Sequence, residues 1–428
     1  MAGREQGGGA DAVARPWYSY LNGRTVSILF LGFSSGLPLY TLIYLMQAWL
    51  AKAGLDVKAL GLFGLAMFPY TFKFLWAPFM DRYTVLPLGR RRGWMAITQL
   101  ALFVLIGGLG MLNPKLELTL ITGMVFLIAF MSASQDVVID AYRREILAEE
   151  EQGLGAAIIV NAYKAASLIP SALGLVLADS QPWQLVFWTV AAFMLPGFVC
   201  TLLAKEPVVY GEPPKNLEEA VVLPFREFVL RDGWKQALFI IAFVLLYKIG
   251  DTMSTALSTK FFLDIGFTTK QIGLAANATG WWASLAGGAV GGIWMVKLGI
   301  NRALWVFGVL QALAILGFAW LAHTGPDQVL LSAVFGFEAF ASLGLGSAAL
   351  VAFMSRATDP RYTATQYALF SSLAAVPRTF INSSVGYIVA ETGWFWFFIV
   401  CFILAFPAMI MLPKIAPWNS GHDGHEKA

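Results

Sequence analysis

Twelve long apolar stretches, separated by polar connections, dominate the hydrophobic pattern of this chain. A helix needs about 20 mostly apolar residues to cross a bilayer, and each stretch is long enough to do so. The pattern therefore predicts twelve transmembrane helices, which run approximately over residues 25–50, 59–80, 94–113, 118–140, 154–178, 183–204, 236–263, 271–296, 302–322, 328–354, 363–390 and 394–413.

The connection at residues 205–235 is longer than the others and divides these helices into two sets of six. We therefore assign a first half to residues 24–204 and a second half to residues 236–413. The polar segments at residues 1–23 and 414–428 are expected to be disordered tails, and the first of them lacks the features of a signal peptide.

Part of the long connection has the pattern of a helix. Asn216 followed by Glu219 is typical of a helix start, because the two side chains can cap the first backbone N–H groups. Apolar and charged residues alternate after it, which predicts an amphipathic helix at the membrane surface. Pro224 is expected to break or kink this helix.

The composition agrees with a membrane protein, since 58% of the residues are hydrophobic and only 13% are charged. Soluble domains carry about 25% charged residues, so a soluble enzyme, a disordered protein and a disulfide scaffold are excluded. The net charge of +3 is small, and we expect no nucleic-acid partner. Cys200 and Cys401 both lie in apolar segments and do not form a disulfide framework.

The distribution of Lys and Arg predicts the orientation in the membrane. Alternate loops, starting with the N-terminal tail, hold 20 of these residues, and the opposite loops hold only Lys52, Lys58, Lys115, Lys260 and Lys270. Short loops rich in Lys and Arg stay in the cytoplasm. Both termini and the long connection are therefore expected to be cytoplasmic.

An internal repeat relates the two halves. Residues 54–62 (GLDVKALGL) and 266–274 (GFTTKQIGL) are identical at four of nine positions, with an offset of 212. The same offset aligns the basic loops after the second and eighth spans and those after the fourth and tenth. Two parallel six-helix repeats resemble the major facilitator superfamily fold, in which the substrate binds between the halves and the halves rock to alternate access.

Ionisable residues within the predicted spans are candidates for function, because charge is costly at bilayer depth. Asp136, Asp251 and Glu338 are the candidates for carrying a coupling proton. Purely structural pairs remain the alternative: Asp136 with Lys73 or Arg143, Asp251 with Lys248 three residues before it, and Glu338 with Arg378. Asp140 is expected to be neutralised by Arg143 or Arg144.

Lys164 and Arg378 lie in repeat-related spans, and two cations facing one cavity would suit an anionic cargo. Lys248 is a third basic candidate for binding cargo. Polar and aromatic residues in the same spans are further candidates for substrate contacts, namely Gln135, Asn161, Tyr163, Asn277, Trp282, Gln366 and Tyr40.

The sequence lacks the signatures of an enzyme, a metal site or an ATP-driven pump. None of the three His residues lies in a span with acids at ligand spacing, and no phosphate-binding GxxxxGK[ST] motif occurs. We therefore expect no cofactor and no metal.

Several motifs resemble the AmpG family of bacterial muropeptide permeases, over about residues 20–413. They are Gly32–Pro38 (GFSSGLP), Lys73–Tyr83 (KFLWAPFMDRY), Gly89–Trp94 (GRRRGW), Ser132–Asp136 (SASQD) with Asp140, and Leu246–Asp251 (LYKIGD). The resemblance implies a monomeric inner-membrane permease that imports GlcNAc-1,6-anhydromuramyl peptides with protons. Such import serves peptidoglycan recycling and the signalling that induces β-lactamase, and so antibiotic resistance.

In the superfamily, an Asp–Arg loop after the second span latches the cytoplasmic side closed. The resemblance assigns this gate to Asp81 and Arg82, with Arg90, Arg91 and Arg92. This chain departs from the general motif, because Gly89 comes eight residues after the Asp instead of three and Ala77 replaces the usual first Gly. Anchoring by positive charge is the alternative role for Arg90, Arg91 and Arg92.

The residues alone indicate a carrier for a polar anion, and the cargo rests on the resemblance. Acetyl-CoA or a sugar is the alternative cargo, and a polytopic membrane enzyme or a sensor that does not transport is a less favoured alternative. The sequence leaves open which acid carries the proton, the stoichiometry and the preferred peptide length.

Overall fold

The computed structural model describes residues 18, 21–54, 67–208, 217–231, 233–376 and 382–419, and its regular structure within these ranges is helical. The first half consists of α1 (Gly23–Tyr40), Thr41–Met46, α2 (Gln47–Lys52), α4 (Phe68–Phe72), Lys73–Leu75, α5 (Ala77–Arg82), α6 (Arg90–Leu109), α7 (Leu118–Ile146), Glu149–Glu151, α8 (Gln152–Ala165), Ile169–Gly174, α9 (Leu175–Leu177), α10 (Trp183–Ala192) and α11 (Leu195–Leu203).

The second half follows the linker helix α12 (Leu217–Arg231). It consists of α13 (Trp234–Leu246), α14 (Ile249–Ala256), α15 (Ser258–Asp264), α16 (Thr269–Leu274), Ala275–Gly280, α17 (Trp281–Thr324), α18 (Gln328–Glu338), Ala339–Gly346, α19 (Ser347–Ala357), α20 (Thr363–Val376) and α21 (Asn382–Ile415). The predicted all-helical fold class is confirmed for the described residues.

The spans agree with the predicted pattern once two sharp turns are considered. Within the described residues, 9 helical segments are long and apolar enough to cross a membrane. The 44-residue α17 contains a non-helical turn at Gly299 with φ of 76°, so it supplies two of the predicted spans. Gly393, with φ of 73°, likewise separates the start of α21 from the last span. The second and eleventh predicted spans lie partly outside the described residues.

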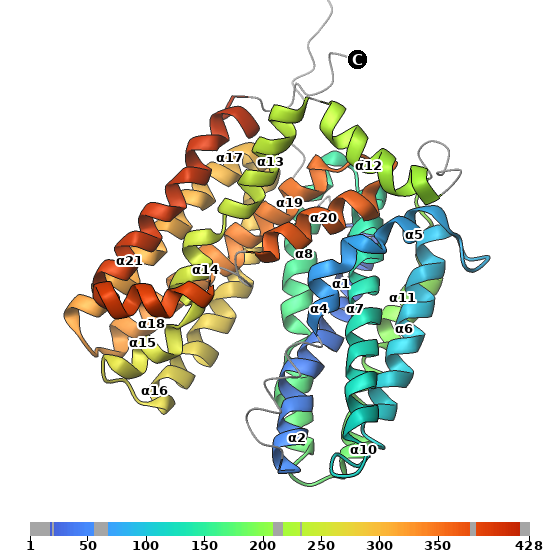
Figure 1. Ribbon diagram of the computed structural model, residues 1–428, viewed down its shortest axis with the longest axis horizontal. Helices are drawn as coiled ribbons and strands as arrows, with labels where there is room; N and C mark the ends of the chain where they lie inside the picture. The colour runs from blue at the N-terminus through green and yellow to red at the C-terminus, as the bar shows by residue number, and fades with distance from the viewer. Residues whose placement is uncertain are drawn as a thin grey trace, which may run out of the picture.

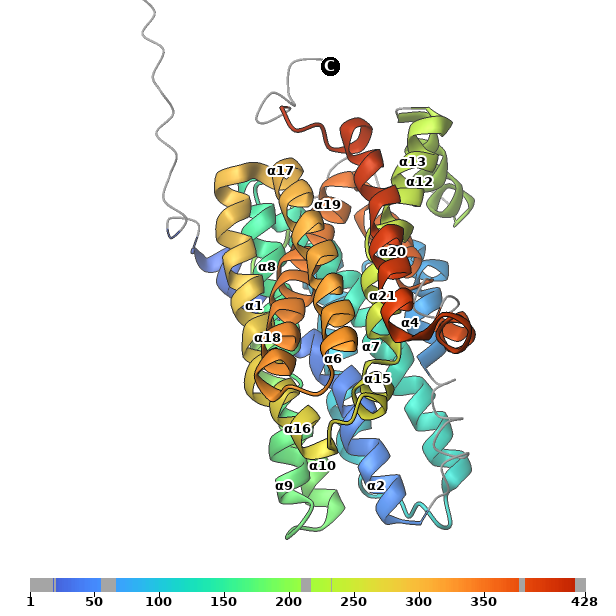
Figure 2. The ribbon, with the colours of Figure 1, turned by 90° about the vertical axis from the view of Figure 1, so that its left-hand side faces the viewer.

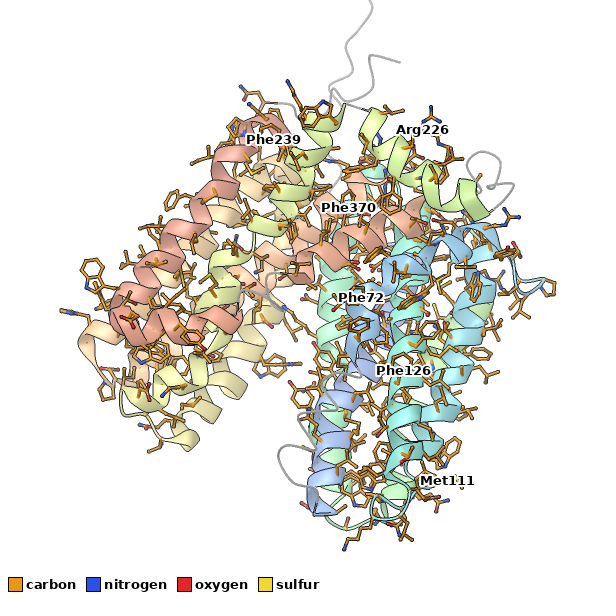
Figure 3. The ribbon with its side chains drawn as sticks, viewed as in Figure 1. Phe72, Met111, Phe126, Arg226, Phe239 and Phe370 are labelled. Atoms are coloured by element: carbon orange, nitrogen blue, oxygen red, sulfur yellow. The ribbon has the colours of Figure 1, made fainter. Side chains whose placement is uncertain are left out.

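The two halves form separate helical bundles that meet at one end and diverge at the other (Figure 1). The end where they meet carries α12, and we call it the linker end. There α20 of the second half packs against α5 and α7 of the first, and α19 packs against α8 (Figures 1 and 2). Figure 3 shows Arg226 at the linker end and Met111 at the opposite end.

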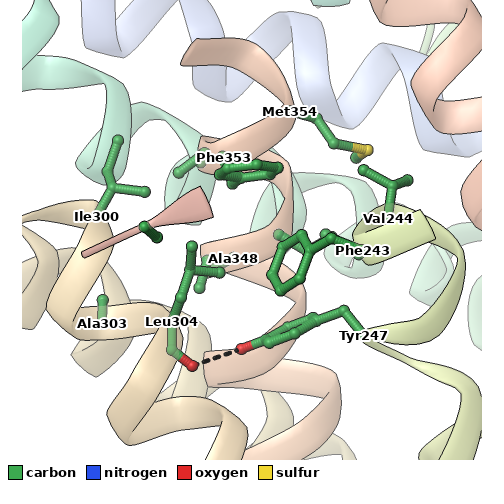
Figure 4. Close-up of a cluster of buried hydrophobic side chains, with 14 of the residues drawn as sticks. Phe243, Val244, Tyr247, Ile300, Ala303, Leu304, Ala348, Phe353 and Met354 are labelled. Carbon is green, nitrogen blue, oxygen red and sulfur yellow. Dashed lines mark hydrogen bonds between the residues drawn. The ribbon is translucent and has the colours of Figure 1, made fainter. Parts of the chain in front are cut away.

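Each half has its own apolar interior. In the second half, Phe243, Tyr247 and Leu304 are buried together, and the Tyr247 hydroxyl donates to the Leu304 carbonyl at 3.2 Å (Figure 4). This bond satisfies the one polar atom of an otherwise apolar side chain. Large apolar side chains such as Phe126 and Met111 remain exposed, which suits a surface that faces lipid (Figure 3).

Small residues allow the helices to approach closely. A Cβ atom on Gly287 would lie 2.2 Å from the Phe340 carbonyl oxygen, and one on Gly344 would lie 2.6 Å from the Gly287 Cα. The side chains are absent there because α17 and the segment Ala339–Gly346 are in backbone contact. This packing, typical of helices in lipid, fixes the position of Ala339–Gly346.

The predicted helix in the linker exists, and of the two outcomes expected at Pro224, a break or a kink, the break does not occur. α12 runs from Leu217 to Arg231 with Pro224 inside it. Tertiary contacts hold the helix together: Phe228 packs against Phe370 of α20 at 5.3 Å between ring centroids, and the Pro224 carbonyl accepts a hydrogen bond from Gln366 at 3.0 Å. Packing can override an unfavourable local residue.

Candidate functional site

Four of the predicted intramembrane residues converge near the π-helical segment Ala339–Gly346. Lys248 Nζ lies 2.8 Å from Asp251 Oδ2, which confirms the predicted pairing. The same ammonium donates to Ser342, to its carbonyl oxygen at 2.8 Å and to its hydroxyl at 2.9 Å. The Ser342 hydroxyl in turn donates to the other carboxylate oxygen of Asp251. The charges of Lys248 and Asp251 are therefore compensated in this conformation.

A break in the seventh span positions this pair. α13 ends at Leu246 and α14 begins at Ile249, so Tyr247 and Lys248 lie between two helices. The Tyr247 carbonyl accepts a hydrogen bond from the Gln311 side-chain amide at 2.8 Å. A broken helix is tolerated within a bilayer when the freed backbone groups are satisfied in this way. Interrupted helices commonly build the binding sites of transporters.

Glu338 and Lys164 complete this cluster. The Glu338 carboxyl is buried and interacts electrostatically with Asp251, Lys248 and Lys164. Its Oε1 atom has no hydrogen-bond partner among the described residues. Lys164, which comes from α8 of the first half, donates to the Leu343 carbonyl. Two lysines from opposite halves therefore bind the neighbouring carbonyls of Ser342 and Leu343. We call Lys164, Lys248, Asp251, Glu338 and Ser342 the charged cluster.

The first half has its own buried acid. Asp136 on α7 accepts a hydrogen bond from the Ser35 hydroxyl on α1. Lys73 lies within electrostatic range of Asp136 and Asp140, but no ion pair within 4.0 Å involves Asp136 in the described part of the chain. Asp140 forms the predicted pair with Arg143 at 3.8 Å. Asp136 and Asp251 each accept a hydrogen bond from a Ser hydroxyl, but only Asp251 has a cation within ion-pair distance.

A carboxyl group bonded to a Ser hydroxyl recurs in both halves. Ser35 and Asp136 join the first and fourth spans of the first half, whereas Asp251 and Ser342 join the corresponding spans of the second half with the acid on the first span. A hydroxyl can donate to a carboxylate or accept from a protonated carboxyl. Each pair can therefore remain hydrogen-bonded in both protonation states.

Three tyrosines form an aromatic surface in the first half. Tyr40 stacks on Tyr44 at 6.0 Å and contacts the edge of Tyr163 at 5.7 Å, so the surface joins α1, its continuation and α8. Tyr44 is 42% exposed, which leaves part of this surface available to a ligand. Aromatic rings that carry a hydroxyl can pack on apolar faces and hydrogen-bond at their edges.

At the linker end, Asp81 joins the two halves. Its Oδ1 accepts from Arg91 at 2.7 Å and from the Ala364 N–H at 3.2 Å, and its Oδ2 accepts from the Thr365 N–H at 2.8 Å and the Thr365 hydroxyl at 2.7 Å. A carboxylate from the first half thus caps the first turn of α20, where it is favoured by the helix dipole. Glu145 holds Arg91 from the other side at 2.6 Å. We call Asp81, Arg91, Glu145, Ala364 and Thr365 the latch.

The other predicted gate residues lie beside the latch. Arg90 donates to the Asp81 carbonyl at 3.0 Å and lies 3.4 Å from Glu145. Arg92 donates to the Thr201 carbonyl at 2.9 Å, which ties α6 to α11. Arg82 lies over the ring of Tyr83 at 5.2 Å. The late position of Gly89 therefore does not prevent Asp81 and Arg91 from meeting.

The structure places several predicted substrate contacts elsewhere. Gln366 lies at the linker end, where its amide binds the Pro224 carbonyl, Glu227, Arg231 and the Asp359 N–H. All its hydrogen-bonding capacity is used there, so in this conformation Gln366 contacts the linker helix.

Asn161 and Gln135 are also engaged within the protein. Asn161 donates to the Leu285 carbonyl at 2.9 Å and so joins the two halves, and Gln135 is fully buried and donates to Ser34 at 3.0 Å. The Trp282 ring is 63% exposed and contacts Trp281 at 4.7 Å. The Asn277 side chain and Arg378 lie outside the described residues.

Residues that the sequence analysis missed act as partners of those it selected. Ser342 follows Glu338 by one helical turn, so their shared face was readable from the spacing. Ser35, Glu145 and Thr365 come from other helices, and their pairing with Asp136, Arg91 and Asp81 depends on the tertiary fold.

We predict that Gln366→Leu loosens α12 from α20. The substitution removes the hydrogen bonds from Gln366 to the Pro224 carbonyl and from the Asp359 N–H to Gln366, and leaving a polar group without its bond costs about 1–3 kcal/mol. The purified variant should therefore melt at a lower temperature and be cleaved faster by trypsin after Arg226 and Arg231. Gln328→Leu is the control, because that amide makes a single long bond of 3.5 Å. Equal cleavage rates in both variants would contradict the prediction.

The sequence and the fold of this chain are similar to those of known proteins. Residues 28–382 match the family described as the Major Facilitator Superfamily. The chain is 39% identical over 391 residues to the anhydromuropeptide permease of Escherichia coli (strain K12), covering 91% of this chain and 79% of that protein. It is 44% identical over 397 residues to an uncharacterized protein of Haemophilus influenzae, covering 91% of this chain and 93% of that protein.

Among solved structures, the fold is similar to the major facilitator superfamily transporter FucP in the outward conformation. The TM-score is 0.69 with 14% sequence identity, covering 92% of this chain and 99% of that chain. At this identity the likeness shows the fold alone.

Proposed function

This chain belongs to the major facilitator superfamily and to its branch of anhydromuropeptide permeases, and on that premise we propose that it imports GlcNAc-1,6-anhydromuramyl peptides in symport with protons. The observation that supports this choice of cargo is the 39% identity to the Escherichia coli permease over 91% of this chain. The cargo consists of sugars that carry a peptide with carboxylates. It serves peptidoglycan recycling and the associated β-lactamase signal.

The charged cluster supports a binding role for its two lysines. Lys164 and Lys248 come from opposite halves and approach the same segment, so a carboxylate bound by both would hold the halves in a defined relation. The tyrosine surface of Tyr40, Tyr44 and Tyr163 offers a complementary place for the sugar rings. The cargo's charge and its rings would then be recognised by different groups.

Proton coupling is supported by the buried acids near the two lysines and the tyrosine surface. Protonation of Asp251 removes the charge that holds Lys248, which frees the ammonium for a carboxylate of the cargo. Glu338 lies beside this pair, and its Oε1 has no hydrogen-bond partner among the described residues. Asp136 is the acid of the first half that, like Asp251, accepts a hydrogen bond from a Ser hydroxyl. Asp251, Glu338 and Asp136 are therefore the proposed proton carriers, and symport follows if cargo binding requires the proton.

The latch supports an assignment of conformational state. With the long linker and both tails in the cytoplasm, as the Lys and Arg distribution predicts, the closed linker end is the cytoplasmic end and the diverging end faces the periplasm (Figure 1). The described conformation then accepts cargo from the periplasm. We propose a multi-pass location in the inner membrane and a monomer as the transporting unit.

The proposal is tested by uptake of labelled GlcNAc-anhydromuramyl tripeptide into proteoliposomes, with and without an imposed proton gradient. Accumulation that collapses with a protonophore is the expected result. Uptake that is insensitive to the protonophore would contradict proton coupling but would still support the proposed cargo. Absence of uptake by folded protein would overturn the cargo, and acetyl-CoA and simple sugars would be the next compounds to assay.

A further inference from the structure

Arg143 is a buried cation whose guanidinium makes no hydrogen bond of normal geometry within the described residues. Its side chain is fully buried on α7, and Nε and both terminal nitrogens have no hydrogen-bond partner among the described residues. An arginine side chain stays charged in a protein and offers five N–H donors. Burying a polar group without partners is unfavourable, and more so when the group is charged. The closed conformation is therefore unfavourable for Arg143.

The surroundings of Arg143 come from both halves. Asp140 lies 3.8 Å away on the same helix and neutralises part of the charge without forming a hydrogen bond. The ring of Tyr367 from α20 covers the guanidinium, with its centroid 5.4 Å from Cζ. The cover over Arg143 is thus supplied by the second half, while Arg143 itself belongs to the first.

The position of this cover relates Arg143 to the latch. Tyr367 follows Thr365 by two residues on α20, and Thr365 is held by Asp81. Movement of α20 away from α7 on opening of the latch would carry the Tyr367 ring off the guanidinium and admit water. Arg143 would then be a hydrated cation on the side that has opened, with its donors available to a ligand.

We propose that Arg143 is a second anion-binding site, which holds a carboxylate of the cargo after the cytoplasmic side has opened. This inference rests on the proposed function, since the ligand is the cargo of that transport. A guanidinium binds a carboxylate through two parallel hydrogen bonds, and Asp140 occupies none of the donors. Lys164 and Lys248 would bind the cargo when the protein faces outward, and Arg143 would bind it on the way to the cytoplasm.

The site is tested by comparing affinity from the two sides of the membrane. Transport of labelled anhydromuramyl tripeptide is measured in right-side-out vesicles and in inverted vesicles, which expose the cytoplasmic face. For Arg143→Gln we expect at least a tenfold higher KM in inverted vesicles and a change of less than twofold in right-side-out vesicles. Arg143→Lys, which keeps the charge, should restore part of the affinity in inverted vesicles.

A control variant and the pattern of KM changes distinguish a binding role of Arg143 from a purely structural one. Arg144→Gln is the matched control, because the neighbouring Arg144 pairs with Glu149 at 3.2 Å and should leave both KM values unchanged. An equal change of KM on both sides for Arg143→Gln, or no change in inverted vesicles, would overturn the second site. Failure of the unmodified protein to transport the tripeptide in either vesicle would instead overturn the proposed function, and the inferred cargo with it.

Discussion

Replacing Asp251 with Asn is expected to abolish proton-driven accumulation while preserving exchange of cargo across the membrane. Asn is similar in size and can still accept a hydrogen bond from Lys248 or Ser342, so the local packing is retained. It carries no charge and binds no proton, so Lys248 is no longer released by protonation. Accumulation under an imposed gradient should fall to the level of equilibration, whereas exchange needs no net proton movement and should continue.

The measurement pairs accumulation and exchange in the same proteoliposomes. Asp264→Asn is the control, because Asp264 is an exposed acid that pairs with Lys260 on the same helix at 3.0 Å. That variant should accumulate cargo normally. If Asp251→Asn also accumulates normally, Asp251 carries no coupling proton, and the same assay on Glu338→Gln and Asp136→Asn identifies the acid that does.

The charged cluster shows what the sequence could and could not predict about the site. The spacing of Lys248 and Asp251 placed them on one helical face, and the cost of charge in lipid selected Glu338 and Lys164. The sequence could not show that Lys164 and Lys248 approach neighbouring carbonyls, because this depends on how α8 and the segment Ala339–Gly346 meet. Distances between helices are set by packing and are not encoded in any local pattern.

The location of Gln366 could not be predicted from the sequence. A Gln near the start of an apolar span resembles a cargo contact when only hydropathy is considered, yet it lies at the linker end and is saturated by α12. The location of α12 against α20 is a tertiary feature, and so is the continuity of α12 through Pro224. The fold was more predictable than the site, because twelve apolar stretches and a repeat are properties of the chain itself.

The second large effect is expected for Asp81→Asn, which should open the linker end, the end that the proposed orientation places in the cytoplasm. Each carboxylate oxygen of Asp81 accepts two hydrogen bonds, from Arg91 and Ala364 on one side and from Thr365 on the other. An Asn in either orientation replaces one of these oxygens by an NH2 group that faces two donors. It also leaves Arg91 with Glu145 as its remaining carboxylate partner in the latch.

The magnitude follows from the bonds that are lost. A hydrogen bond to a charged group contributes about 1.5–3 kcal/mol. Since about 1.4 kcal/mol corresponds to a tenfold change in an equilibrium constant, losing even one such bond favours the inward-facing state by roughly 10- to 100-fold. Uptake from the periplasm should fall accordingly, because fewer molecules present the outward-facing state.

The opening is measured with a cysteine placed under the latch. Ala368 is fully buried one turn further along α20, where it packs with Val137 and Tyr142 of the first half. In a background with Cys200 and Cys401 replaced by Ala, Ala368→Cys should react slowly with a maleimide applied to inverted vesicles. Adding Asp81→Asn should raise the rate about tenfold or more.

Asp327→Asn provides a control of the same chemistry. Asp327 also caps a helix, accepting from the Val329 and Leu330 N–H groups at 2.8 and 2.9 Å, but both bonds reach a single oxygen and lie within the second half. Asn can keep both bonds there, and no contact between the halves is involved, so the introduced thiol should stay protected. If Asp81→Asn leaves that thiol equally protected, contacts such as Asn161 with Leu285 must hold the cytoplasmic side closed, and the latch only adds to them.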